Sequence, residues 1–213
     1  MHGRYPDYDV LEQQDSWDEV TRRMILDRVE NVPPLRFFGV AEAETLGVFV
    51  DLVMAQDSEP RIPVLAYVDE KLFDGALDGY QFFDVPDDRE TWRRVARGLD
   101  EEAQKLGAER FPLLRVRDQL DVVHRFANSE LHGGVWGTLS VARAWSVVMR
   151  HVLQSFYSHP WAWNEIGFGG PAYPRGYSRF GSPHLQGAER ETWEGKQAYD
   201  VDPVGDTESR GLE

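Results

Sequence analysis

The chain contains no cysteine. This absence excludes disulfide bonds, thiolate zinc sites, iron–sulfur clusters and covalently attached haem, because each of these needs a cysteine sulfur. The chain also lacks any run of eighteen apolar residues, so we expect no helix that spans a bilayer. Basic residues are outnumbered: 23 Lys and Arg stand against 37 Asp and Glu, which gives a formal net charge of -14. Such a charge repels phosphate backbones and anionic lipids, so nucleic acid and membrane surfaces are poor partners.

Catalytic signatures are missing as well. No glycine-rich phosphate loop lies between a strand and a helix, and Ser182 lacks the second glycine of a hydrolase elbow. The six histidines do not show the spacing that places two metal ligands on one helix face, so we interpret them as half-exposed residues at helix ends. The acidic pairs Asp69–Glu70 and Glu101–Glu102 are interpreted as solvated helix faces. We therefore expect no catalytic residue, no cofactor and no metal in this chain.

The amino terminus gives an expectation about location. It carries acidic residues where a signal peptide has a basic patch followed by an apolar run, and no twin-arginine pair precedes such a run. The sequence therefore predicts a cytoplasmic protein, or one that is carried to the periplasm or cell exterior together with an exported partner.

Apolar residues at helical spacing predict about six helices, and so an all-α fold with a single helical bundle. The sequence places Asp87 or Asp88 at the start of the fourth helix and Gly107 at its end. In the first helix we expect Trp17, Val20, Met24 and Ile25 to share the buried face. The predicted helices cover approximately residues 16–29, 39–54, 64–73, 88–106, 113–126 and 139–156.

The periodicity stops after Phe156, where glycine, proline and aromatic residues become dense. This composition predicts a structured loop without helix or strand. Residues beyond Gly187 are mainly acidic and polar. The predicted organisation is an N-terminal extension over residues 1–15, a helical bundle over 16–158, the aromatic loop over 159–187 and an acidic tail over 188–213.

The aromatic loop is the strongest candidate for function. Trp, Tyr and Arg are the residues that most often anchor protein interfaces, so the loop is suited to contact another protein. A lid that folds back on one end of its own bundle explains the same composition, and both roles are compatible.

Four segments of the chain also resemble, in order, the gluconate 2-dehydrogenase subunit 3 family of bacterial small subunits. They are FFGVAEAETLGVFVDLVMAQD, IPVLAYVDEKLFDG, RGLDEEAQKLGAERFPLL and WNEIGFGGPAYPRGY, and the resemblance extends from about Phe38 to Gly181. The last segment is the most specific, with Trp163, Ile166, Gly167, Gly170, Pro171, Pro174, Gly176 and Tyr177 in its pattern.

The resemblance implies a partner. Such small subunits bind a large flavoprotein of the glucose–methanol–choline (GMC) oxidoreductase type, often alongside a cytochrome c subunit. The large subunit holds FAD and acts on sugars, sugar acids, glycosides or related alcohols, while the small subunit helps it to fold, remain stable or be exported. Many members carry a twin-arginine signal, which this sequence does not show.

Together, the composition of the loop and the resemblance predict a contact surface. We expect the contact to be formed or bordered by Trp163, Phe168, Tyr173, Tyr177 and Phe180. We expect the shape of the loop to depend on Gly167, Gly170, Pro171, Pro174 and Gly176. Two alternatives remain: a free-standing helical adaptor that uses the same loop, and an independent enzyme with a histidine and carboxylate metal site in its bundle.

Overall fold

The computed structural model describes residues 9–76, 79 and 81–171. Within these residues it contains helices and no strand, so the prediction of an all-α fold is confirmed. The α-helices are α1 (Glu19–Glu30), α2 (Val40–Val53), α3 (Val64–Asp74), α4 (Asp88–Lys105), α5 (Val116–Ala127), α6 (Val141–Tyr157) and α7 (Pro160–Ile166). Three 3-10 helices accompany them: η1 (Val10–Ser16), η2 (Phe111–Leu113) and η3 (Gly134–Thr138).

The helices belong to two compact units, whereas the sequence predicts one bundle. The larger unit is continuous and contains residues 32–156, and so α2 to α5 and all but the last residue of α6. The smaller unit combines residues 9–31 with residues 157–171, and so η1, α1 and α7. Helical periodicity reports local structure only, so it does not reveal that the two ends of the described chain pack together.

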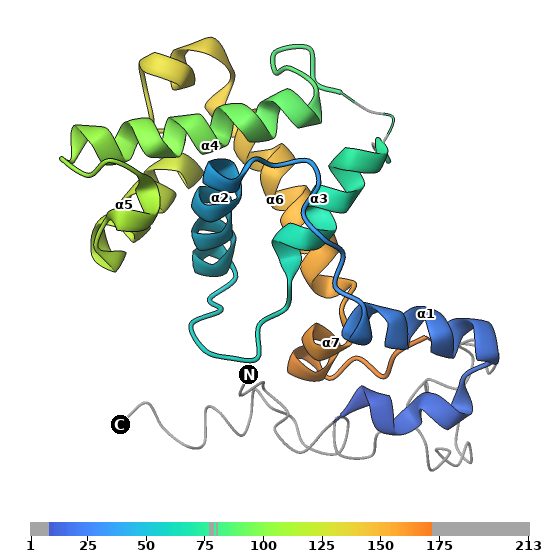
Figure 1. The fold of residues 1–213 in the computed structure, drawn as a ribbon. Coiled ribbons are helices and arrows are strands. Elements are labelled where there is room, and N and C mark those ends of the chain that lie inside the picture. Colours follow the sequence, from blue (N-terminus) through green and yellow to red (C-terminus); the bar gives the residue numbers. More distant parts are fainter. Residues whose placement is uncertain (1–8, 77–78, 80, 172–213) are drawn as a thin grey trace, which may run out of the picture. The chain divides into compact units, whose positions relative to one another are not determined.

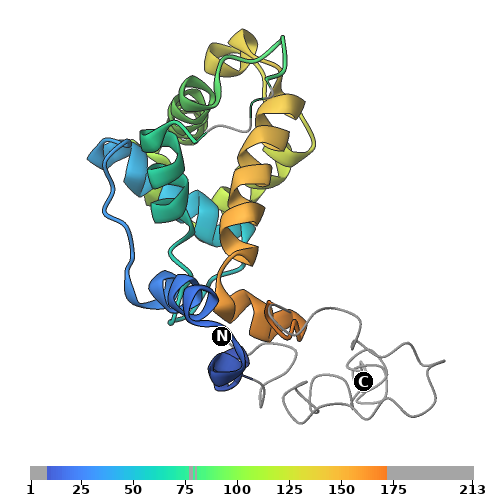
Figure 2. The same ribbon diagram turned by 90° about the vertical axis from the view of Figure 1, so that its right-hand side faces the viewer.

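Helix α4 is the centre of the larger unit. Its residues Trp92, Val95 and Leu99 recur at helical spacing and are fully buried. The helix packs against α2 and against η3, which lie on different sides of it (Figures 1 and 2). Gly98 allows η3 to approach closely, because a β-carbon at this position would lie 2.6 Å from Cζ2 of Trp136.

A buried carboxylate fixes the chain just before α2. Asp69 of α3 is fully buried, and its Oδ1 accepts hydrogen bonds from the backbone N–H groups of Arg36 at 2.6 Å and Phe37 at 3.1 Å. Its Oδ2 accepts from Phe38 N at 2.8 Å. The interpretation of Asp69 as part of a solvated face is therefore wrong: its charge is balanced by N–H donors that would otherwise lack partners.

Glu102 of α4 is a second buried carboxylate, and for it too the interpretation as a solvated residue is wrong. Its side chain is 1% exposed and forms ion pairs with Lys105 at 2.5 Å and with Arg125 of α5 at 3.3 Å. A carboxylate this deeply buried is tolerated because two cations compensate its charge. The ion pair with Arg125 also links α4 to α5.

The smaller unit has its own apolar core. Val10, Trp17, Ile25 and Trp163 are buried together, and Leu11 and Phe168 pack against them. The predicted buried face of the first helix is correct for Trp17 and Ile25 and wrong for two other positions. Val20 and Met24 are more than half exposed. None of the helices in the described part of the chain combines the length and the apolar character that a bilayer span requires.

Candidate functional site

Helix α7 lies at the start of the segment that the sequence singles out for function. The prediction that no helix follows Phe156 is wrong, because residues Pro160–Ile166 are helical. His159 caps the helix by accepting a hydrogen bond from Trp161 N at 3.2 Å, and Pro160 occupies the first turn, where its missing N–H costs nothing. Gly167 ends the helix in the left-handed conformation. The proline and the glycine therefore bound a short helix.

Polar contacts attach α7 to the amino-terminal part of the chain. The side chain of Asn164 accepts a hydrogen bond from Val10 N at 2.8 Å and donates one to Asp9 Oδ1 at 3.2 Å. Arg28 of α1 donates to the carbonyl oxygen of Ser158 at 2.5 Å. These bonds join residues that are at least 130 positions apart in sequence, so α7 is positioned by long-range packing.

Two of the predicted interface residues pack inside the chain. Trp163 is 7% exposed, and its indole N–H donates to the carbonyl oxygen of Tyr157 at 2.7 Å. The ring of Phe168 meets the Trp163 ring edge-on at 5.5 Å between centroids. Both side chains thus take the intramolecular role that the sequence left open, and their contact with a partner stays a prediction.

Gly167 and Gly170 lie where a side chain is unfavourable. Both have positive φ, 67° at Gly167 and 78° at Gly170. A β-carbon at Gly170 would also lie 3.0 Å from Cζ2 of Trp17 and from Cγ2 of Val10. Pro171 is the last described residue. The predicted interface residues Tyr173, Tyr177 and Phe180, and the loop residues Pro174 and Gly176, lie outside the described residues.

His159 gives the smaller unit a testable pH dependence. Burial lowers the pKa of its imidazole from 6.5 to about 4, because the charged form would lose its hydration. Below pH 6.5 the unfolded chain takes up a proton that the folded chain does not bind until about pH 4. Stability should therefore fall as the pH decreases through this window, and no further loss from this group is expected below it.

We expect the His159→Asn variant to lose less stability than the wild type between pH 6.5 and pH 4. Asparagine keeps an oxygen that accepts a hydrogen bond at the helix start but does not titrate. The difference should be on the order of 2 kcal/mol after allowance for solvent screening. Urea unfolding curves at several pH values measure it, and parallel pH profiles for the two proteins would contradict the assignment.

The alternative of a metal enzyme depends on the histidines. Of the four described histidines, His124 and His132 are exposed, whereas His151 and His159 are buried. The interpretation as half-exposed residues is therefore wrong for the latter two. His151 lies on the buried face of α6, where its Nδ1 accepts a hydrogen bond from the indole of Trp92 at 3.0 Å. Its Nε2 lies 3.4 Å from Oδ2 of Asp88. The described residues contain no group of three or more His, Asp or Glu side chains placed to hold a metal ion.

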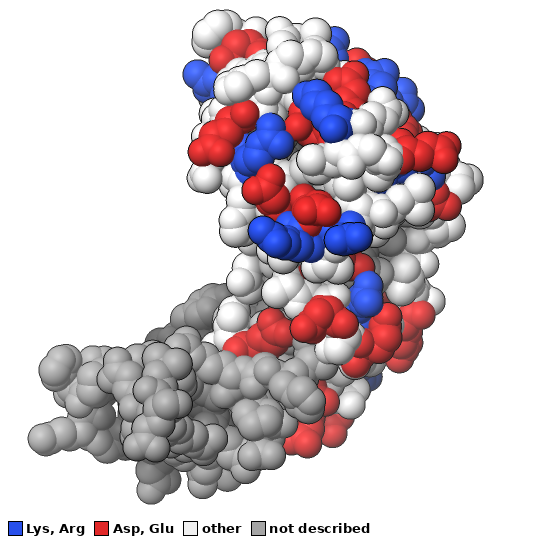
Figure 3. Space-filling model, turned by 90° about the vertical axis from the view of Figure 1, so that its left-hand side faces the viewer, with Lys and Arg blue, Asp and Glu red and all other residues white. Residues whose placement is uncertain are grey.

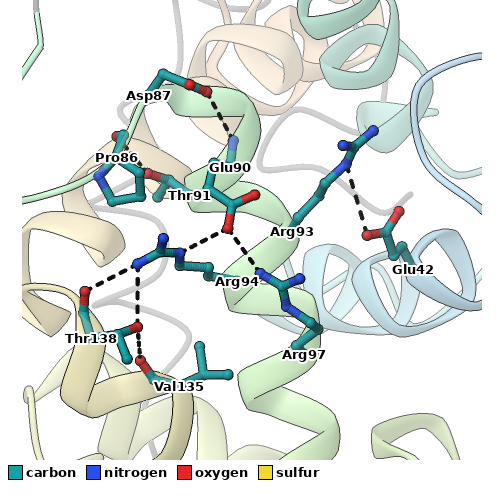
Figure 4. A network of polar contacts seen from close by, with 10 residues as sticks. All are labelled: Glu42, Pro86, Asp87, Glu90, Thr91, Arg93, Arg94, Arg97, Val135 and Thr138. Carbon is teal, nitrogen blue, oxygen red and sulfur yellow. Dashed lines mark hydrogen bonds and ion pairs between the residues drawn. The ribbon is translucent and has the colours of Figure 1, made fainter.

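A cluster of charged side chains covers the outer face of α4. The Oε1 of Glu90 accepts hydrogen bonds from Arg94 and from Arg97, both at 2.9 Å (Figure 4). The hydrogen bond from Arg94 is the largest influence that lowers the pKa of Glu90. Arg94 also donates to the carbonyl oxygen of Thr138 at 3.1 Å and so holds η3 against α4. The arginines favour the ionised form of Glu90, so this carboxylate is unsuited to act as a proton donor. The contacts of the cluster hold η3 against α4.

Comparison with known protein families gives a match. The family model described as gluconate 2-dehydrogenase subunit 3 matches residues 40–170, which extend from the start of α2 to Gly170. No curated protein and no solved structure matches the chain.

Proposed function

The chain belongs to the gluconate 2-dehydrogenase subunit 3 family, and on that premise we propose that it is the non-catalytic small subunit of a flavin-dependent dehydrogenase. Its partner is a large GMC-type subunit that carries FAD and acts on sugars, sugar acids, glycosides or related alcohols. The role of the chain is to bind this subunit and stabilise its folded state.

The observation that carries the proposal is the extent of the family match. It includes the helices of the larger unit and continues through α7 to Gly170. Membership makes the chain a subunit of a multi-subunit dehydrogenase complex. The GMC type of the large subunit, its FAD and an accompanying cytochrome c subunit are parts of the proposal.

The buried polar side chains of the larger unit support a non-catalytic role, because their contacts are structural. Asp69 accepts from backbone N–H groups, Glu102 is compensated by two cations, and His151 accepts from an indole. Each of these groups makes contacts that hold helices together. A chain of this kind still acts on its partner, because any protein that binds the folded state and not the unfolded state stabilises it by mass action.

We further propose that the segment from Trp163 to Phe180 forms or borders the contact. The buried position of Trp163 affects how this is tested, because Trp163→Ala would open a cavity in the core of the smaller unit. Ile166 is a better position on α7 for a substitution that tests the contact, since this residue is 51% exposed.

For the location of the protein, we propose a cytoplasmic complex, with joint export of the two subunits as the alternative.

We expect a large flavoprotein to co-purify with this chain under mild conditions from its native host. The visible spectrum should show flavin absorption near about 450 nm, and the mass of the second chain identifies the large subunit. Removing the small subunit should lower the melting temperature of the large one. A colourless chain that purifies alone would contradict the proposal and favour the free-standing adaptor.

Ile166→Asp then tests where the contact lies. We expect weaker co-purification, because a carboxylate in the contact would have to be desolvated. Val20→Asp is the matched control, since Val20 is exposed to a similar extent, 54%, on α1 of the same unit. Equal retention of the flavoprotein by both variants would argue against a contact at α7.

A further inference from the structure

Helix α7 packs against the amino-terminal segment of residues 9–31, which carries η1 and α1. We call this segment the strap. It contributes Val10, Trp17 and Ile25 to the apolar core around Trp163. The three helical elements lie together in both ribbon views (Figures 1 and 2). One side of α7 is therefore covered by the chain's own amino-terminal part.

The family match includes one partner of this contact and not the other. It begins at residue 40 and ends at residue 170, so it contains α7 but not the strap. The apolar side of α7 thus belongs to the part of the chain that the family model describes, whereas its cover does not. This difference favours a use of that side of α7 besides packing against the strap.

Few buried side chains hold the strap in place. Ile25 is the only buried residue of the 12-residue helix α1, and an isolated helix of this length is marginal in water. Trp17 is 6% exposed, and its indole N–H has no acceptor among the described residues. A buried donor without an acceptor is unfavourable, and it would regain a hydrogen bond to water when the strap leaves.

The connection to the larger unit allows the strap to leave while that unit stays folded. Residues 31–35 contain no helix, and all of them except Pro33 are exposed. The chain is fixed immediately afterwards, because the backbone N–H groups of residues 36–38 donate to the buried carboxylate of Asp69. Release of the strap can therefore end at residue 35. Segments with few buried contacts are the ones that open locally in folded proteins.

We propose that the strap is a releasable cover: it opens while the larger unit stays folded, and its opening exposes Trp163 and Phe168 to the large dehydrogenase subunit. This inference rests on the proposed function and concerns how the predicted contact becomes accessible. The structure shows the closed state, in which both side chains pack inside the chain. A partner that binds only the open state shifts the population toward it.

The large subunit suits the opened face better than a second copy of the chain does. A second copy that exchanged its strap would form the contacts of the closed monomer again and gain none to offset the entropy lost on association. Nor does charge mark another docking surface on the face shown in Figure 3, where basic side chains lie beside acidic ones and form no extended positive field. The large subunit adds apolar contacts that the closed chain lacks.

The absence of cysteine allows the opening to be measured with single thiols. Val10 and Val95 are both fully buried, the first in the strap and the second in α4. We expect the thiol of Val10→Cys to react with dithiobis-nitrobenzoate at least about tenfold faster than that of Val95→Cys, because local opening is more frequent than unfolding of the larger unit. Equal rates would overturn the strap as a separate opening unit.

A reversible cross-link tests whether binding needs the opening. Nδ2 of Asn164 lies 3.2 Å from Oδ1 of Asp9, so Asp9→Cys with Asn164→Cys places two thiols between the strap and α7. A short bifunctional methanethiosulfonate should hold the strap closed and lower the affinity for the purified large subunit at least about tenfold, because it removes the open state. Dithiothreitol should restore binding. The monofunctional methyl reagent on the same two thiols is the matched control and should not lower the affinity.

The outcomes separate this inference from the proposed function. A cross-linked chain that binds like the reduced one would overturn the releasable cover while the small-subunit role stands. A wild-type chain that binds no flavoprotein would overturn the proposed function, and with it the large subunit as the occupant of the opened face. If the reduced variant forms dimers that the cross-link prevents, the face binds a second copy, which would also overturn the large subunit as its occupant.

Discussion

Replacing Asp69 with asparagine is expected to lower the free energy of unfolding of the larger unit by about 3–5 kcal/mol. The carboxylate accepts hydrogen bonds from three consecutive backbone N–H groups, those of Arg36, Phe37 and Phe38, and is fully buried. An asparagine side chain keeps one acceptor oxygen but directs an NH2 group toward N–H donors. At least one buried donor then loses its partner.

Asp74→Asn is the matched control. Asp74 lies on the same helix and contacts the same segment, since its Oδ1 accepts from Nη2 of Arg36 at 3.3 Å, but its side chain is 52% exposed. Exposed ion pairs contribute little, so a change below about 1 kcal/mol is expected. Urea unfolding followed by circular dichroism measures both variants. Similar small losses in the two would show that the Asp69 hydrogen bonds contribute little to stability.

Much of the helical structure was predictable from local pattern. The six predicted helices correspond to α1 to α6, and Asp87 caps α4 by accepting a hydrogen bond from Glu90 N at 2.9 Å. These features depend on neighbours in sequence: apolar spacing marks a helix, and a short acceptor side chain marks its start. The conformation of α7 was missed because its bounding residues, Pro160 and Gly167, were interpreted as helix breakers.

The buried face of each helix was harder to predict. In α1, Met24 is 58% exposed although its spacing fits the predicted face, whereas Ile25, the next residue, is buried in the core that it forms with Trp163 of α7. In α6 the buried face includes His151, which a polarity scale places outside. Its burial depends on the indole of Trp92, 59 positions away. Which side of a helix is covered depends on partners distant in sequence.

The same limit applies to the candidate site. The sequence identified the density of aromatic residues around Trp163 but could not show that this side chain is needed in the core of its own unit.

Replacing Gly98 with alanine is expected to destabilise the larger unit by about 2–4 kcal/mol, although alanine is the better helix former by roughly 1 kcal/mol. A β-carbon at this position would lie 2.6 Å from Cζ2 and 2.7 Å from Cε2 of Trp136. The indole cannot easily move away, because it is 2% exposed and its ring lies 4.9 Å from that of Phe126. The variant should therefore displace η3 from α4.

Gly47→Ala separates this packing effect from helix propensity. Gly47 is also inside a helix, α2, but its β-carbon would lie 3.8 Å from Cδ2 of Leu65, an ordinary contact. Alanine should stabilise the chain there by up to about 1 kcal/mol, so the two substitutions are expected to have opposite signs. Trp136 fluorescence should change only in Gly98→Ala. If both alanines stabilise the protein, the contact between α4 and η3 must be looser than the structure shows.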